Sequence, residues 1–130
     1  MEKAGVKTRD IQFFSQKNGR MICVHNRWAR DYAKHLERES WVAGYETGRP
    51  LDLNQFTHVN PIGIRSSYFQ TAWVSDFFIQ YADGRCCERE LTTTEALRRQ
   101  AVVEKLELSR RYWSALDVAD WKVVIADAHP

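Results

Sequence analysis

The chain has 130 residues, of which 44% are hydrophobic and 12% aromatic, so it can bury the core of one globular domain. The net charge of +2 is too small to indicate nucleic-acid binding by itself. No stretch approaches the roughly 20 apolar residues of a membrane span, and the start of the chain lacks a signal region. We therefore expect a cytoplasmic protein without membrane contact, with residues 1–130 forming a single domain.

The first half of the chain predicts a hairpin, a helix and a strand. Two apolar runs, 11–14 and 21–24, flank a turn signal at Asn18-Gly19 and predict a β-hairpin. From Asn26, a plausible N-cap, apolar residues recur every three or four positions, which is typical of an amphipathic helix. Residues 41–46 then predict a short strand, and the glycines and prolines of 47–66 predict a loop-rich segment.

The second half predicts another hairpin, followed by a helix and a final strand. Residues 72–81 and 85–91 are β-like and flank Asp83-Gly84, a strong hairpin turn signal. A long helix is expected from about 93 to 116, and a closing strand at 121–126. The order of elements favours an α/β fold in which a mixed central sheet is flanked by helices.

The cysteines give no sign of a disulfide framework or a zinc site. The three residues, Cys23, Cys86 and Cys87, are odd in number and show no CxxC or cysteine–histidine spacing of the zinc-binding kind. Reduced thiols are therefore expected.

Basic residues gather in two helical segments. One group follows three- or four-residue steps and would line a helical stripe; it comprises Arg27, Arg30, Lys34 and Arg38. The second segment contains Arg98, Arg99, Arg110 and Arg111. Either group is explained by a solvated helix face or by a surface that contacts DNA phosphates. We consider Arg98 and Arg99 together with the first group as candidate DNA-binding residues.

Two carboxylates stand out in the second hairpin. Asp76 lies within an apolar strand, where a carboxylate is costly unless it is paired or binds a metal. Glu90 lies on the neighbouring strand, and Thr92 shares its face. An Asp on one strand and Glu-x-Lys on the next is how many metal-dependent nucleases hold Mg²⁺ and activate water. The spacing alone is a weak signal, because carboxylate pairs are common.

Four sequence blocks carry a resemblance to a known family. They are FSQKNGR at 14–20, HLERESWV at 35–42, VSDFFIQYADG at 74–84 and EKLELSRRYW at 104–113. In this order and spacing they resemble the N-terminal nuclease domain of TnsA, the DNA-cutting subunit of heteromeric bacterial transposases. The resemblance covers residues 6 to about 127. It implies a restriction-endonuclease-like fold of the PD-(D/E)xK class, and we expect the chain to comprise the nuclease domain without the family's C-terminal domain.

The resemblance also implies a damaged metal site. Asp76 matches the family's catalytic aspartate, and Glu90 is acceptable at the next ligand position. The lysine position holds Thr92, and the position of the helical glutamate holds Ala29, so a cation and a ligand are missing. Thr92 would instead begin a capping box with Glu95 at the start of the long helix. Relocated groups are the alternative, with His25, Glu37, Arg98 or Lys105 as substitutes.

Three hypotheses follow. The first is a TnsA-like subunit that binds duplex DNA, a transposase subunit or the target-selecting ATPase, with impaired catalysis. The second is an active Mg²⁺-dependent endonuclease with relocated groups, cutting at transposon ends. The third is a protein-interaction or inhibitor module that reuses the fold without chemistry.

Overall fold

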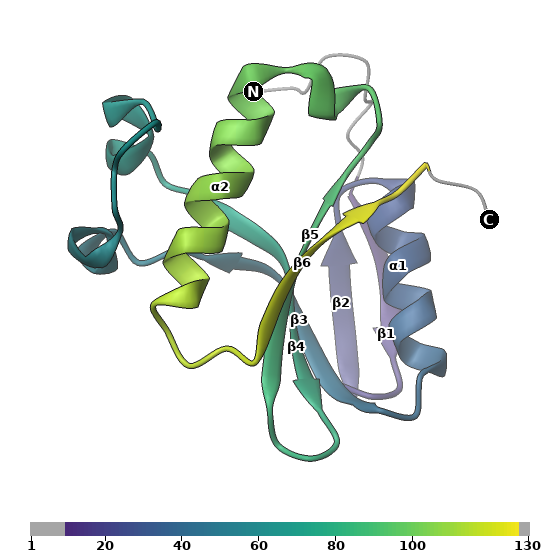
Figure 1. The fold of residues 1–130 in the computed structure, drawn as a ribbon. Helices are drawn as coiled ribbons and strands as arrows, with labels where there is room; N and C mark the ends of the chain where they lie inside the picture. The colour runs from purple at the N-terminus through teal and green to yellow at the C-terminus, as the bar shows by residue number, and fades with distance from the viewer. Residues whose placement is uncertain (1–9, 128–130) are drawn as a thin grey trace.

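A computed structural model describes residues 10–127 of the chain and shows a mixed α/β fold (Figure 1). The hairpin of β1 (Ile11–Ser15) and β2 (Arg20–Val24) is followed by helix α1 (Arg27–Arg38). Strands β3 (Val42–Pro50), β4 (Val74–Tyr81) and β5 (Cys86–Thr92) precede helix α2 (Gln100–Ser114) and strand β6 (Asp120–Ile125). Short 3₁₀ turns occupy 53–58, 66–70 and 96–98.

The main sheet has four strands in the order β3-β4-β5-β6, and it is mixed. The three consecutive strands β3, β4 and β5 pair antiparallel, whereas β6 pairs parallel to β5. The parallel pair requires a crossover, which α2 supplies between the two strands. The expected α/β fold with a mixed sheet and two main helices is therefore confirmed.

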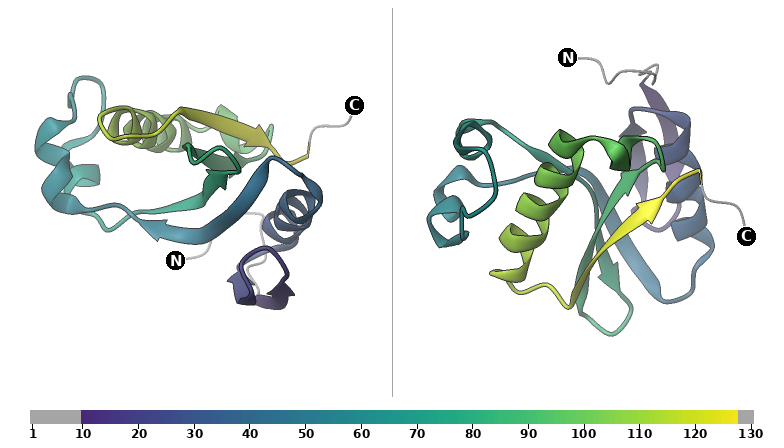
Figure 2. Two further views of the ribbon diagram at one scale, coloured as in Figure 1. Left: turned by 90° about the horizontal axis from the view of Figure 1, so that it is seen from below. Right: turned by 45° about the horizontal axis from the view of Figure 1, so that its top comes forward.

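The two helices cover opposite faces of this sheet (Figure 2). On one face, α1 and the β1–β2 hairpin bury Leu36 and Ile22 against Phe77 and Ile79. On the other face, α2 and the segment between β3 and β4 form a second apolar cluster, which includes Leu108, Trp113 and Phe78. We call these the α1 layer and the α2 layer.

The local turn and cap signals correspond to observed structure. Gly19 adopts φ +66 in the first hairpin turn and Gly84 adopts φ +91 in the second, a backbone conformation that favours glycine. The side chain of Asn26 accepts a hydrogen bond from the Ala29 backbone N–H, as an N-cap does. Both predicted hairpins and the start of α1 are confirmed.

Two boundaries differ from the prediction. Strand β3 runs to Pro50, four residues beyond the expected end, because it pairs with β4 along this length. Helix α2 begins at Gln100 rather than near 93. The capping box at Thr92 is wrong, since Thr92 ends β5 and pairs with Ile125. The hydroxyl of Thr93 instead accepts from the Ala96 N–H at the 3₁₀ turn.

Within residues 10–127, neither helix has the length and apolar character that crossing a bilayer requires.

Candidate functional site

Strands β4 and β5 separate at the end that carries the candidate carboxylates. Their backbone pairing ends at Phe77 and Arg89, although both strands continue beyond this point. Past it, side chains replace the missing backbone partners. The Asp76 N–H donates to Glu90 Oε1 at 3.0 Å, and the Leu91 N–H donates to Asp76 Oδ2 at 2.8 Å. The two residues therefore lie across from each other where the strands part, as the sequence predicted for adjacent antiparallel strands.

Strand β4 also changes the faces of its side chains at this point. Phe78 stacks near Trp113 in the α2 layer, and Phe77 contacts Tyr32 in the α1 layer. Regular alternation would place Ser75 on the same face as Phe77. Instead, the Ser75 hydroxyl accepts a hydrogen bond from Trp113 Nε1 at 2.8 Å, in the α2 layer. The change of face falls at Asp76, whose backbone N–H bonds to the Glu90 side chain beyond the end of the β4–β5 backbone pairing.

Glu90 is held by a buried hydrogen-bond network in the α2 layer. Its Oε2 accepts from the hydroxyls of Ser75 at 2.8 Å and Ser109 at 2.5 Å. Each hydroxyl in turn accepts from a tryptophan indole, Trp113 for Ser75 and Trp121 for Ser109. With the Asp76 N–H on Oε1, the carboxylate has protein donors on both oxygens, and such donors stabilise its charged form.

Burial and charge repulsion act against this stabilisation. Burial, and next the neighbouring Asp76 carboxylate, raise the pKa of Glu90 above its usual value, while the bonds from Ser109, the Asp76 N–H and Ser75 lower it. A carboxyl that titrates nearer to neutral pH is a common feature of functional sites, although buried networks without chemistry show it too.

A third carboxyl, Glu88, belongs to the same cluster and was missed by the sequence reasoning. Its side chain is 0% exposed, and neither of its oxygens has a hydrogen-bond partner among the described residues. Burial, then repulsion from Glu90 and Asp76, raises the pKa of Glu88 to about 10, so the group is neutral at physiological pH. Glu88 and Glu90 are two residues apart on one strand, and this spacing was the available signal.

The three carboxyls do not form a compact set of ligands. Among residues 10–127, their oxygens are not all within 4.8 Å of one another, whereas those of a different group, described below, meet that distance. Mg²⁺ requires near-octahedral oxygen ligands at about 2.0–2.1 Å. With Glu90 surrounded by protein donors and Glu88 protonated, this arrangement does not fit a resident Mg²⁺ ion.

The resemblance implies two further positions, Ala29 and Thr92, and Ala29 lies on the other side of the sheet from Glu90. Ala29 packs against the core of the α1 layer, whereas Glu90 contacts Ser109 of α2, so the sheet lies between them. The structure therefore does not bring Ala29 to the Glu90 cluster. Thr92 is 9% exposed at the end of β5, two residues beyond Glu90. Lys105, one of the possible substitutes, places its ammonium group 4.7 Å from the centre of the Trp73 ring.

The basic residues of α1 divide into two kinds. Arg30 is half-buried and donates to the Asp31 carboxylate through Nε and Nη2. Arg27, Lys34 and Arg38 are exposed, and none makes an ion pair within the described part of the chain. This stripe lies on α1, in the α1 layer. Arg98 and Arg99 are exposed in the connection that follows β5, near the carboxylate end of the sheet.

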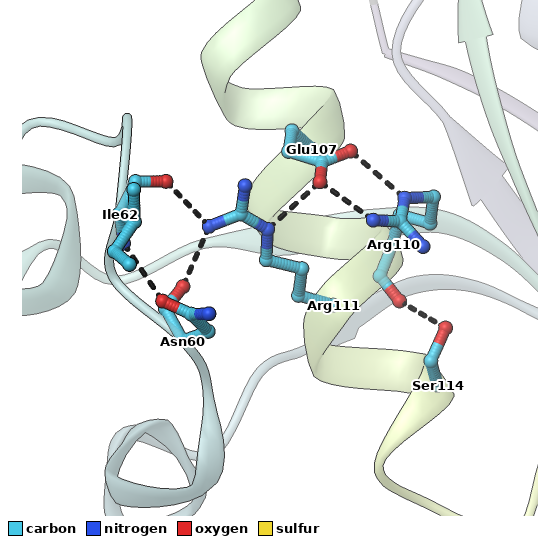
Figure 3. A network of polar contacts seen from close by, with 6 residues as sticks. All are labelled: Asn60, Ile62, Glu107, Arg110, Arg111 and Ser114. Atoms are coloured by element: carbon cyan, nitrogen blue, oxygen red, sulfur yellow. Dashed lines mark hydrogen bonds and ion pairs between the residues drawn. The ribbon is translucent and has the colours of Figure 1, made fainter.

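Arg110 and Arg111 form hydrogen bonds and ion pairs within the protein (Figure 3). Both donate to the Glu107 carboxylate, at distances of 2.6–2.8 Å. Arg111 Nη1 also donates to the carbonyl oxygens of Asn60 and Ile62, each at 2.7 Å. Arg111 thereby joins the segment between β3 and β4 to α2, and the two guanidinium groups share the single Glu107 carboxylate.

No family model and no curated protein matches this chain.

Proposed function

We propose that this chain is a TnsA-like, restriction-endonuclease-like domain that binds duplex DNA and has lost efficient phosphodiester cleavage. The observation that carries the proposal is the separation of β4 and β5 at Asp76 and Glu90, with protein hydrogen bonds occupying the carboxylates. In a metal-dependent nuclease, two such carboxylates hold the ion. Here hydroxyl and backbone N–H groups bond to the carboxylates instead. This arrangement is expected of a former metal site that no longer binds an ion.

The arrangement of elements supports the same family assignment. An α1-β3-β4-β5-α2-β6 order with a parallel β5–β6 pair is compatible with the fold that the resemblance implies. The four sequence blocks that carry the resemblance occupy the first hairpin turn, the end of α1, β4 and α2. The carboxylates lie at the ends of strands rather than in loops, so the scaffold fixes their positions.

Loss of catalysis follows from the missing charge. Thr92 cannot supply the cation of a Glu-x-Lys motif, and preorganised charge usually makes the largest contribution to catalysis of this kind. Removing one such group commonly reduces the rate by about 10²–10³. We expect no nicking of supercoiled DNA in Mg²⁺ or Mn²⁺ at ordinary enzyme concentrations. Metal-dependent nicking that disappears in Asp76→Ala would instead favour an active enzyme.

The second candidate function is an active endonuclease, and two residues near Glu90 favour it. Glu88 provides a third carboxyl, and Lys105 on α2 lies one helical turn before Ser109, which contacts Glu90. Nicking that is lost in both Glu88→Gln and Lys105→Ala would establish this alternative.

DNA binding is assigned to the exposed stripe of α1. Phosphate contacts from lysine and arginine provide affinity that is independent of base sequence and falls with salt. Each neutralised phosphate contributes about 0.9 to the slope of log affinity against log salt concentration. Lys34→Ala combined with Arg38→Ala should therefore flatten the slope by about two, measured by fluorescence anisotropy of a labelled duplex.

The matched control is Arg85→Ala combined with Lys122→Ala, which changes the net charge equally at exposed positions outside α1. It should leave the salt slope within experimental error of the original protein. Asp76→Ala should bind equally or slightly more tightly, because it removes a negative charge. No binding by the unmodified protein would reject the DNA function in favour of a protein-interaction module; equal loss in both double variants would reject the α1 stripe as the interface.

A further inference from the structure

A second cluster of potential ligands lies at the open end of the first hairpin. Asp10 immediately precedes β1, Cys23 lies in β2, and His25 follows the end of that strand. The pairing of Ile11 with Val24 places Asp10 across from His25. Cys23 and His25 are two residues apart, the spacing that returns to the same face of a strand. One ligand atom from each of the three residues lies within 4.8 Å of the other two.

We propose that Asp10, Cys23 and His25 form a site for a divalent transition-metal ion of the zinc type. The donors are a thiol sulfur, an imidazole nitrogen and a carboxylate oxygen. This mixture suits Zn²⁺, whereas Mg²⁺ and Ca²⁺ select oxygen ligands. With three protein ligands, the fourth tetrahedral position is open to water or to a ligand from another molecule. The inference is independent of the proposed DNA function, since the site lies in the α1 layer away from Glu90.

The geometry is close to what a tetrahedral ion needs. Bond lengths of about 2.0–2.3 Å place neighbouring ligand atoms roughly 3.3–3.6 Å apart around the ion. His25 Nδ1 and Asp10 Oδ1 are 2.9 Å apart, so this pair must open slightly, and all three ligand atoms lie within 4.8 Å of one another. The side chains of His25 and Asp10 are 69% and 75% exposed, so rotation about their bonds can adjust these distances without disturbing the core.

The thiol distinguishes this cluster from an ordinary surface ion pair. An exposed His–Asp pair contributes about 0–1 kcal/mol and does not require a third group beside it. Cys23 is half-buried and free of any disulfide, and its thiol makes only a long hydrogen bond, 3.8 Å, to the Val24 carbonyl, which a metal ion would replace. A bound ion would join the start of β1 to the residue preceding the Asn26 cap, and would stabilise the folded hairpin by an amount that grows with the logarithm of the ion concentration above its Kd.

Cobalt(II) provides a direct test, because a thiolate bound to Co²⁺ gives a charge-transfer absorption band and tetrahedral coordination intensifies the visible bands. The full chain, kept reduced with a non-thiol phosphine, should show both signals during titration with Co²⁺, and Zn²⁺ should displace the cobalt. Changes in residues surrounding a metal's ligands already cost 10–100-fold in affinity. Cys23→Ser should therefore abolish the charge-transfer band and weaken Zn²⁺ binding by about 100-fold or more.

Cys86→Ser is the matched control, since Cys86 is also a half-buried free thiol but lies outside the cluster. It should retain the band and the affinity. His25→Ala should weaken binding while keeping a sulfur signal in the cobalt spectrum at high metal concentration. Absence of the band in the unmodified chain, its persistence in Cys23→Ser, or its loss in Cys86→Ser would each overturn the proposed site. Circular dichroism of each variant verifies that folding is unchanged.

Discussion

Two neighbouring residues of β5, Arg89 and Glu88, place ionisable side chains in different layers. Of the two, only the Arg89 side chain has hydrogen-bond partners among the described residues. In the α1 layer, Arg89 donates to the Asp120 carboxylate and the Glu88 carbonyl, with the Tyr81 hydroxyl close by. In the α2 layer, Glu88 has no hydrogen-bond partner for either oxygen among the described residues. Both side chains are buried. A buried charge is tolerated when paired, whereas an unpaired carboxyl takes up a proton.

The paired groups keep their charge at all ordinary pH values, whereas the charge of Glu88 depends on pH. Arg89 and Asp120 hold β5 to β6 and remain ionised, because burial acts to raise the pKa of Asp120 but the bonds from Arg89 and Tyr81 lower it overall. Glu88 stays neutral until a cation or high pH removes its proton. The carboxyl cluster of the α2 layer is therefore the region whose charge can change with conditions.

The largest expected effect comes from unpairing Arg89. Asp120→Asn keeps the shape of the side chain but leaves the buried guanidinium without its countercharge. Breaking a buried pair from one side costs about 3–5 kcal/mol, and the partial exposure of Asp120 places the expected loss near the lower limit, about 3 kcal/mol. Urea denaturation measures it. Asp31→Asn, which breaks the exposed pair with Arg30, is the control and should cost less than about 1 kcal/mol. Equal losses would contradict the comparison.

Glu88→Gln should change stability in the opposite direction. The folded chain keeps the Glu88 proton up to about pH 10, while the unfolded chain releases it near its ordinary pKa of 4.5. Between these values the folded state holds more protons, so stability falls as pH rises, by at most about 1.4 kcal/mol per pH unit. At pH 8 this loss would be at most about 5 kcal/mol. The neutral amide removes the pH dependence but still buries polar atoms without partners, so we expect a net gain on the order of 2 kcal/mol near pH 8.

Denaturation at about pH 6 and about pH 9 tests the sign, because the advantage of Glu88→Gln should grow with pH. Glu95→Gln, at an exposed position, controls for the loss of a negative charge. A gain that is constant with pH would show that Glu88 is not titrating, and would leave only a packing effect.

The smallest effect is expected at Ser109. Ser109→Ala removes one of the donors to Glu90 Oε2 and the acceptor of the Trp121 indole. Ser75 and the Asp76 N–H remain on Glu90, so the expected loss is about 1–2 kcal/mol. Since the lost bond lowers the pKa of Glu90, that pKa should rise further, observable by ¹³C NMR of the carboxyl. Ser114→Ala, on the exposed side of α2, is the control and should change neither quantity.

The sequence by itself determined the features that depend on neighbouring residues. Asn18-Gly19 and Asp83-Gly84 set the two hairpin turns because glycine adopts positive φ at little cost. Asn26 set the start of α1 through its own side chain. The adjacency of Asp76 and Glu90 also followed from sequence, since the second turn fixes which residues of β4 and β5 lie across from each other.

Only the tertiary structure decided the features that depend on distant partners. The parallel β5–β6 pair, the contact of Glu90 with Ser109 and the bonds of Arg111 to Asn60 and Ile62 join residues whose separation no local pattern encodes. The reversal of side-chain faces at Asp76, which brings the Ser75 hydroxyl to Trp113, is likewise seen only in the tertiary structure. Which carboxyl is charged, and which arginine is available to a ligand, depends on burial and partners, and these arise only when the layers close on the sheet.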